Sequence, residues 1–360
     1  MEIIKVNLVE ASYKIYIEKN LMKKIPSYIK ETNAGNFSII LTTIKIYSLY
    51  KKYIKQTFKS LPHKVIPLVD GERAKSKECF FRVIEKIMKI DDIKRRIYII
   101  SLGGGVIGDL GGFVASLYKR GIPYFQIPTT FLAQIDASIG GKTAINLKKA
   151  KNIIGTFHQP KAVFIDPLFL TTLTSKQIKE GLAEVIKYSV IKDEKLFSLL
   201  IDNSQKILKL DMDVILPIIS HCARIKARIV EKDEKERKGI RTILNFGHTI
   251  GHALETMLKY KKLTHGEAVS LGMICEGYIS YYLNQCRKED LQKLIKIIEI
   301  FSLPTKVSFD YSDFFQAMKY DKKFIYGGIR MVIFKKIGEV EVRKDIPLKI
   351  VKRGLRKIAF

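Results

Sequence analysis

A cluster of glycines restricts most strongly what this chain can fold into. Six glycines lie between residues 103 and 112, after the β-branched run of residues 96–102 and before an apolar helical pattern. Residues 103–108 satisfy G-x-G-x-x-G in the strand-to-helix context where backbone N–H groups can meet a pyrophosphate. So many clustered glycines also argue against a membrane-spanning helix over residues 97–118, a run whose single charge is Asp109.

The glycine loop allows two interpretations. One is a nucleotide-binding turn, and the other is a turn that only packs a helix on a sheet. The ordinary dinucleotide fold has an acidic residue about twenty positions later to bind the ribose. Pro128 occupies that place here. The sequence therefore predicts a nucleotide that is bound differently from the ordinary Rossmann manner.

Composition narrows the class of protein. With 360 residues, 47% of them hydrophobic, the chain can bury a large core, and its length suggests two domains. The four cysteines form no C-x-x-C pair, and the N-terminal strand pattern lacks the apolar centre of a signal peptide, so we expect a cytoplasmic location. The net charge of +28 is spread over many segments without a nucleic-acid-binding motif. We therefore expect neither nucleic acid nor a membrane as partner.

Hydrophobic periodicity predicts an α/β half followed by a helical half. In the first half we expect strands at 37–43, 64–69, 96–102, 124–128 and 162–166, helices at 46–58 and 75–90, and a leading hairpin of 3–9 with 13–17. In the second half we expect helices at 175–200, 215–231, 248–258 and 267–283, then a hairpin of 331–334 with 339–342. The predicted fold is an α/β N-terminal domain with a parallel, Rossmann-like sheet, residues 1–170, and a C-terminal domain, residues 171–360, that is all-helical apart from this hairpin.

A second glycine loop, residues 138–143, carries Lys142 followed by Thr143. It is not a Walker motif, because Asp136 stands where that motif needs its first glycine. A lysine and a hydroxyl on a tight turn, with Lys151 and Asn152 shortly after, suit the binding of an anion. A solvated loop lysine is the alternative interpretation.

Two histidines, His248 and His252, are spaced i and i+4 and so share one helix face. With His265 and Glu184 they provide enough nitrogen and oxygen ligands for a catalytic zinc site with open positions. The protease motif H-E-x-x-H is absent, because residue 249 is Thr. A purely structural histidine pair is the alternative.

Five motifs together resemble the 3-dehydroquinate synthase family. They are GGGVIGD at 103–109, PTT at 128–130, DASIGGKTA at 136–144, GLAEVIK at 181–187 and NFGHTIGH at 245–252. The sequences HGE at 265–267 and DKK at 321–323 also fall where that family has them. The resemblance implies an enzyme, a phosphorus–oxygen lyase of the shikimate pathway of aromatic amino acid biosynthesis.

The resemblance implies one particular reaction. It converts 3-deoxy-D-arabino-heptulosonate 7-phosphate to 3-dehydroquinate and phosphate by transient NAD-dependent oxidation, phosphate elimination, re-reduction and intramolecular aldol closure. The implied cofactors are NAD and Zn²⁺, with Co²⁺ as an alternative, and the implied partner is a small phosphorylated sugar acid. By resemblance, Glu184, His248 and His265 bind the metal. A homodimer is implied as well, because Arg120 matches a residue that reaches the phosphate from a partner subunit.

The remaining site residues are also implied by resemblance. The matches for NAD binding are Glu72, Lys75, Gly103, Gly104, Gly105, Asp109, Thr129, Thr130, Lys151, Phe169 and Thr172. The matches for substrate binding, mostly cations and amides, are Arg120, Asp136, Lys142, Asn152, Lys226, Arg241, Asn245, His252 and Lys322. The matches for catalysis are Lys142, Lys187, Lys226, Asn245 and His252.

Two positions depart from the family pattern, which has an acidic residue at 43 and a small polar residue at 180. This chain has Thr43 and Glu180, and we expect weaker NAD binding because a hydroxyl offers the ribose fewer acceptors than a carboxylate. Other sugar phosphate cyclases and metal-dependent alcohol or glycerol dehydrogenases are the alternatives. A glycerol dehydrogenase has no need of the cations assigned to the substrate, and a non-catalytic protein would not need the metal ligands.

Overall fold

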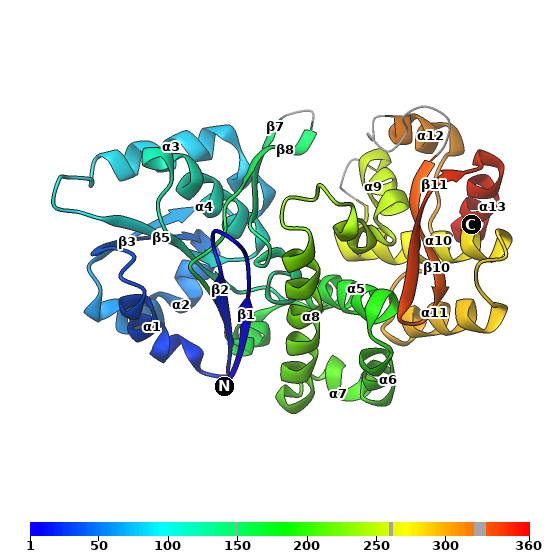
Figure 1. Cartoon of the computed structure of the whole chain (residues 1–360), viewed down its shortest axis with the longest axis horizontal. Coiled ribbons are helices and arrows are strands. Elements are labelled where there is room, and N and C mark those ends of the chain that lie inside the picture. Colours follow the sequence, from blue (N-terminus) through cyan, green and yellow to red (C-terminus); the bar gives the residue numbers. More distant parts are fainter. Residues whose placement is uncertain (148–149, 259–261, 320–328) are drawn as a thin grey trace. The chain divides into compact units, whose positions relative to one another are not determined.

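Seven strands from the first half of the chain form one sheet in the computed structural model, which describes residues 1–147, 150–258, 262–319 and 329–360 (Figure 1). The chain divides into two compact units. Unit 1 comprises Met1–Leu173 and Lys226–Lys235, and unit 2 comprises Thr174–Ile225 and Glu236–Phe360. The division into folding domains after residue 170 stays a proposal.

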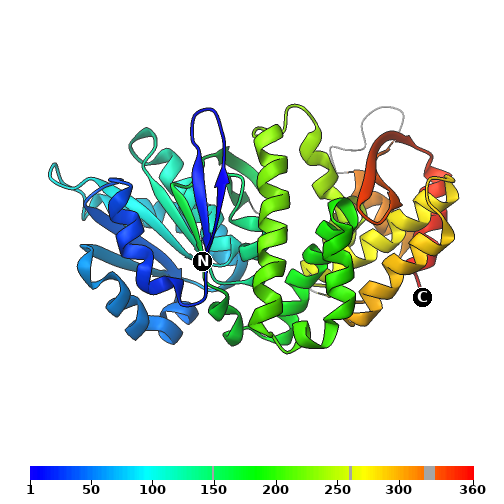
Figure 2. The ribbon, with the colours of Figure 1, turned by 60° about the horizontal axis from the view of Figure 1, so that its bottom comes forward.

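The sheet of unit 1 is parallel except at one edge. Its order is β1-β2-β9-β6-β5-β3-β4, and only β1 runs antiparallel to its neighbour. The strands are β1 (Glu2–Val6), β2 (Tyr13–Ile17), β3 (Phe37–Thr43), β4 (His63–Leu68), β5 (Ile97–Gly103), β6 (Tyr124–Pro128) and β9 (Ala162–Ile165). This confirms the predicted Rossmann-like parallel sheet and the leading hairpin, which is dark blue in Figure 2.

Helices cover both faces of this sheet because successive strand residues point to opposite sides. Ile39 and Ile99 pack with α3 (Lys77–Met88) and α4 (Gly105–Leu117) on one face. Ile40 and Ile100 pack with α1 (Ile25–Glu31) and α2 (Ile44–Thr57) on the other. The central strands are therefore rich in apolar residues on both faces, and the glycine loop between β5 and α4 lies at their carboxyl edge.

The second glycine loop leads into a hairpin, which differs from the continuous loop predicted over residues 138–143. Gly140 and Gly141 have φ of 98° and 67°, a region that favours glycine. Lys142 already begins β7 (Lys142–Leu147), which pairs with β8 (Ala150–Phe157). The interpretation of residues 138–143 as a continuous loop is therefore wrong in its last two residues.

The second half of the chain contains the predicted helices with one correction. The expected helix over residues 175–200 is two helices, α5 (Ser175–Lys192) and α6 (Glu194–Asp202). Asp193 has an extended backbone, and its carboxylate accepts the N–H of Leu196 at 2.9 Å. An Asp that can cap a new helix competes with continuation of the old one, so the chain turns here.

The helix α10 (His265–Tyr282) is the centre of unit 2, because it contacts α5, α9 (His248–Met257), α11 (Lys288–Ile300), α13 (Leu348–Ile358) and β10 (Ile329–Lys336). Strand β10 pairs with β11 (Glu339–Ile346), which confirms the predicted hairpin. The helices α7 (Ser204–Leu208), α8 (Met212–Lys232) and α12 (Tyr311–Lys319) complete the described α-helices of the second half, and a 3-10 helix spans Ile240–Asn245. Among the described residues, none of the helices has the length and apolar character needed to cross a membrane.

Candidate active site

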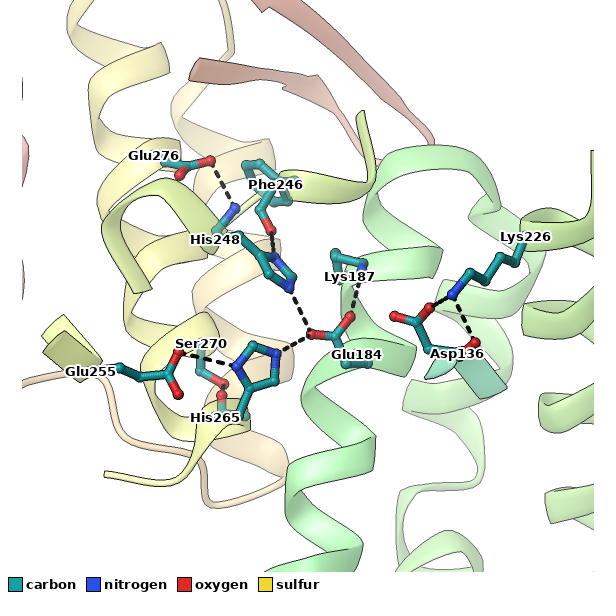
Figure 3. A network of polar contacts seen from close by, with 12 residues as sticks. Asp136, Glu184, Lys187, Lys226, Phe246, His248, Glu255, His265, Ser270 and Glu276 are labelled. Carbon is teal, nitrogen blue, oxygen red and sulfur yellow. Dashed lines mark hydrogen bonds and ion pairs between the residues drawn. The ribbon is translucent and has the colours of Figure 1, made fainter. Parts of the chain in front are cut away.

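Three side chains of unit 2 that could bind a metal ion, Glu184, His248 and His265, lie close together (Figure 3). Glu184 lies on α5 and is fully buried, while His248 and His265 are the first residues of α9 and α10. Their Nε2 atoms lie 3.3 Å and 3.5 Å from Glu184 Oε1. The structure thus brings together residues that are separated by 64 and 81 positions in the chain (184 to 248 and 184 to 265).

The start of α9, and with it His248, is held by α10. Gly247 has φ of 78°, and a Cβ there would lie 2.7 Å from the carbonyl oxygen of Val269. Its N–H donates to Glu276 Oε2 at 2.8 Å, and Glu276 is fully buried. Any side chain at 247 would be strained and would push the two helices apart, so His248 depends on this glycine.

The start of α10 is fixed by a capping box. The Thr264 hydroxyl accepts the N–H of Glu267 at 3.3 Å, and the Glu267 carboxylate accepts the N–H of Thr264 at 2.7 Å. This reciprocal pair satisfies donors that a helix otherwise leaves unpaired. His265 therefore stands at a defined helix start.

Lys187 keeps the buried carboxylate of Glu184 charged. It is also fully buried, lies one turn further along α5, and forms an ion pair with Glu184 Oε2. Burial alone would raise the pKa of Glu184, but Lys187 and His248 outweigh it and hold that pKa well below its ordinary value.

The two histidines differ in charge although both face Glu184. Burial lowers the pKa of His248, and Glu184 offsets this only in part. Burial also opposes the charged form of His265, but Glu184 and Glu255 outweigh it and raise the pKa of His265 to about 10. The difference follows from the second carboxylate, because Nδ1 of His265 faces Glu255 whereas Nδ1 of His248 lies 3.1 Å from the neutral carbonyl of Phe246.

The residues present fit a divalent cation. Their ligand atoms all lie within 4.8 Å of one another. The buried carboxylate of Glu184 faces both imidazoles, with Oε1 3.3 Å from His248 Nε2 and 3.5 Å from His265 Nε2, so all three side chains can reach one cation. In a second group, His252, Glu255 and His265, the possible ligand atoms also lie within 4.8 Å of one another. Two imidazoles and a carboxylate are a donor set typical of catalytic zinc, because they leave positions open.

The backbone of the glycine loop in unit 1 lies very close to the residues that follow β6. Gly104 is the N-cap of α4, and a Cβ there would lie 2.9 Å from the Thr130 side chain. The N–H of Thr129 donates to the carbonyl of Gly103 at 3.0 Å. The loop therefore brings Thr129 and Thr130 beside an open helix N-terminus, where N–H groups favour an anion.

A polar cluster lies beside this loop. The buried ammonium of Lys75 bonds to Asp109 on α4 and to the Asn152 side chain on β8. Burial raises the pKa of Asp109, and Lys75 counteracts that rise. Glu72 accepts from Asn146 at 2.7 Å, and the N–H of Asn152 donates to Asn146 at 3.0 Å. The cluster joins the β7–β8 hairpin to α4.

The other predicted site residues fall into several places. Lys226 donates to the Asp136 carbonyl at 2.7 Å and pairs with its carboxylate (Figure 3). Phe169 packs in the core on the α1–α2 face, and Thr172 bonds to the Tyr50 hydroxyl at 2.8 Å. Arg241 is buried and pairs with Glu236, and Asn245 is half-buried. Thr172 is exposed, as are Arg120, Lys142, Lys151 and His252, and Lys322 lies outside the described residues.

Sequence reasoning missed three polar residues that support these groups, Glu255, Glu276 and Asn146. Glu255 had a signal, because it lies seven residues after His248 and so shares its helix face. Glu276 and Asn146 had none, because their partners are distant in sequence.

Comparison with solved structures gives the class of protein. A 2-epi-5-epi-valiolone synthase from Streptomyces hygroscopicus, with NAD⁺ and Zn²⁺ bound, matches with a TM-score of 0.88 and 25% identity over 98% of each chain. A 2-deoxy-scyllo-inosose synthase complexed with carbaglucose-6-phosphate, NAD⁺ and Co²⁺ matches with a TM-score of 0.89 and 24% identity over 99% of each chain. The fold is that of the sugar phosphate cyclases.

Comparison of sequences gives the family. Residues 65–180 match the family model for the 3-dehydroquinate synthase N-terminal region, and residues 181–324 match that for the C-terminal region. A 3-dehydroquinate synthase from Thermodesulfovibrio yellowstonii is 41% identical over 364 aligned positions, covering 99% of this chain and 100% of the relative. The chain belongs to the 3-dehydroquinate synthase family, which confirms the resemblance.

Proposed function

We propose that this protein converts 3-deoxy-D-arabino-heptulosonate 7-phosphate to 3-dehydroquinate and phosphate, as the second step of the shikimate pathway, in the cytoplasm. The observation that carries the proposal is the group formed by the buried Glu184 with His248 and His265 in a chain of this family. When bound, NAD supplies a reversible hydride acceptor and Zn²⁺ or Co²⁺ supplies a Lewis acid. A relative of the same fold is solved with NAD⁺ and Zn²⁺, which supports these cofactors.

In this proposal Glu184, His248 and His265 hold the metal, and Lys187 keeps Glu184 ionised. Three protein ligands leave positions for substrate oxygens. The N–H groups of Gly103 to Gly105 bind the pyrophosphate of NAD, and the side chains assigned to NAD are Glu72, Lys75, Asp109, Thr129, Thr130, Lys151, Phe169 and Thr172.

The substrate carries a phosphate and a carboxylate, and the proposal assigns cations and amides to them. Asp136 orients the ammonium of Lys226 through two contacts. The other assigned residues are Arg120, Lys142, Asn152, Arg241, Asn245, His252 and Lys322. Their contribution is orientation of the substrate and electrostatic stabilisation of developing negative charge.

The test is release of phosphate from the heptulosonate phosphate in the presence of NAD and Zn²⁺. We expect release to stop when a chelator removes the metal and to resume when metal is added. NADH should not accumulate, because oxidation and reduction take place on the same bound substrate. Stoichiometric NADH during steady turnover would assign the protein to the dehydrogenases instead.

Metal affinity should rise with pH, because His265 must lose the proton on Nε2 to coordinate. The pKa of His265 is raised to about 10, since Glu184 and Glu255 outweigh burial. Below that value each bound metal displaces one proton, so affinity should rise about tenfold per unit between roughly pH 7 and pH 9. His248 adds no proton in this range, because its pKa is lowered. Titration against a chelator of known pH dependence measures this slope, and a slope near zero would contradict it.

We further propose that the protein acts as a homodimer in which Arg120 reaches the partner's substrate. Lys119, Arg120 and Gly121 have φ of 48°, 64° and 122°, and such consecutive left-handed residues persist only where their surroundings hold them. Asp91 does so, since it accepts from the Tyr118 hydroxyl at 2.5 Å and pairs with Lys119 at 2.6 Å. The turn presents the exposed Arg120 at the surface.

Mixing two inactive variants tests this arrangement. Arg120→Ala removes the residue that is donated, and Glu184→Ala removes a metal ligand in the receiving subunit. A mixed dimer contains one site in which both residues are intact, so about a quarter of wild-type activity is the ceiling for a randomly mixed population. Recovered phosphate release supports the proposal. Confirmed mixed dimers without any recovery would count against it.

A further inference from the structure

The two ring nitrogens of His265 have different surroundings. Nε2 faces Glu184 at 3.5 Å, and Nδ1 lies 3.2 Å from Glu255 Oε2 (Figure 3). An imidazole that coordinates through Nε2 carries its proton on Nδ1, and the acceptor at Nδ1 decides which nitrogen has the lone pair. Glu255 is placed as that acceptor.

The position of Glu255 is fixed by its helix and by burial. Glu255 lies on α9 seven residues after His248, so both residues share one helix face. On that face His248 contacts Glu184, and Glu255 contacts His265. Its relative exposure is only 7%, although a buried carboxylate is costly unless it is paired. The contact with His265 Nδ1 is the pairing that the structure gives it.

His248 provides an internal comparison. Its Nδ1 lies 3.1 Å from the carbonyl of Phe246, while its Nε2 faces Glu184. Both imidazoles therefore direct Nε2 toward the same carboxylate and have an oxygen acceptor behind Nδ1. The acceptor is a neutral carbonyl in one case and a carboxylate in the other, and a carboxylate makes the ring a stronger ligand.

We propose that Glu255 is a positioning residue for the metal. It accepts the Nδ1–H of His265, which leaves Nε2 as the coordinating atom and fixes the ring plane toward Glu184. This inference rests on the proposed function only in assuming that Glu184, His248 and His265 bind a divalent metal. It adds a residue that does not touch the metal but determines how firmly the metal is held.

A competing role for Glu255 makes a different prediction. Glu255, His252 and His265 also have ligand atoms within 4.8 Å of one another, so Glu255 could itself bind a second cation. In that arrangement His265 would use Nδ1 as a ligand rather than as a donor. The protein would then bind two metal ions per chain, and the loss of Glu255 would remove one of them.

The test is the rate of metal release from the zinc-loaded full chain into excess chelator at fixed pH. Release starts from the metal-bound protein, so protonation of the metal-free histidine does not enter the measurement. Glu255→Gln keeps an oxygen acceptor but removes its charge, and Glu255→Ala removes both. We expect release about 10- to 100-fold faster in the Gln variant, and faster still in the Ala variant.

The matched control is Glu267→Gln, the same change two residues after His265. Glutamine preserves the capping box with Thr264, so its release rate should stay within about twofold of wild type. Melting temperatures of the metal-free proteins check that the folds are equivalent, and the isosteric Gln variant suffices if the Ala variant unfolds.

Three results would overturn the inference. Equal release rates for wild type and Glu255→Gln would show that the carboxylate does not matter. Two metal equivalents in wild type and one in the variant would make Glu255 a ligand. A wild-type protein that binds no metal would overturn the proposed function as well. This failure is told apart from failure of the Glu255 inference alone, because it is seen in the wild-type protein without any variant.

Discussion

The His248→Ala variant is expected to lose its metal and with it all measurable phosphate release. His248 is one of only three protein ligands in the proposed site, and its Nε2 lies 3.3 Å from Glu184 Oε1. Residues that merely support a ligand contribute about 10- to 100-fold to metal affinity, so the loss of a ligand should exceed that range. The substitution also leaves the buried Glu184 carboxylate with one partner fewer, which destabilises the metal-free protein.

The measurement is metal analysis after dialysis, together with phosphate release. His221→Ala is a suitable control, because it removes a histidine from unit 2 that pairs with Asp193 at 2.8 Å and lies outside both candidate metal groups. The control should retain about one metal per chain. Retention of metal by His248→Ala would show that the ligand assignment is wrong.

The sheet of unit 1 was predictable because its strands are buried on both faces. Residues 37–43 and 124–128 are rich in β-branched and aromatic residues, and β3 and β6 have these bounds in the structure. The β7–β8 hairpin was hidden, because its glycines suggested only a loop. Gly112 explains why a hairpin fits there, since a Cβ at this position would lie 2.4 Å from the Thr143 side chain of β7.

Local capping also decided features that periodicity could not predict. An apolar pattern runs through residues 175–200, yet Asp193 ends one helix and caps the next. Thr43 similarly caps α2 by accepting the N–H of Ile46 at 3.2 Å, so it has a structural role where the family pattern has an acid. Because the Thr43 hydroxyl already accepts this bond, it is less available to the ribose of NAD, in line with the expected weaker binding.

Some contacts of the candidate site can be predicted from the spacing of residues in the sequence, and others are known only from the fold. The i and i+4 spacing of His248 and His252 put both on one helix face, but it could not say which of them faces Glu184. The pairing of Lys75 with Asp109 joins residues 34 positions apart, and no local pattern signals it. Such contacts depend on how strands and helices are ordered, which the chain specifies only through its whole fold.

His252→Ala should retain the metal and lose phosphate release. His252 lies one turn after His248, with its ring centroid 5.3 Å away and perpendicular, and 6.0 Å from the ring of His265. It is close to the metal group, yet the group that includes Glu184 contains only His248 and His265. A fourth protein ligand would also close the positions that substrate oxygens need.

In the proposed function, we expect the exposed imidazole of His252 to serve the phosphate of the substrate. There it can donate a hydrogen bond and transfer a proton during elimination, a contribution of roughly two to three orders of magnitude in rate. We therefore expect His252→Ala to hold about one metal per chain and to release phosphate about 10²- to 10³-fold more slowly. Metal analysis and phosphate release on the same preparation give both values. If His252→Ala and His248→Ala are equally depleted of metal, both histidines are ligands, and the elimination must obtain its proton donor from another residue.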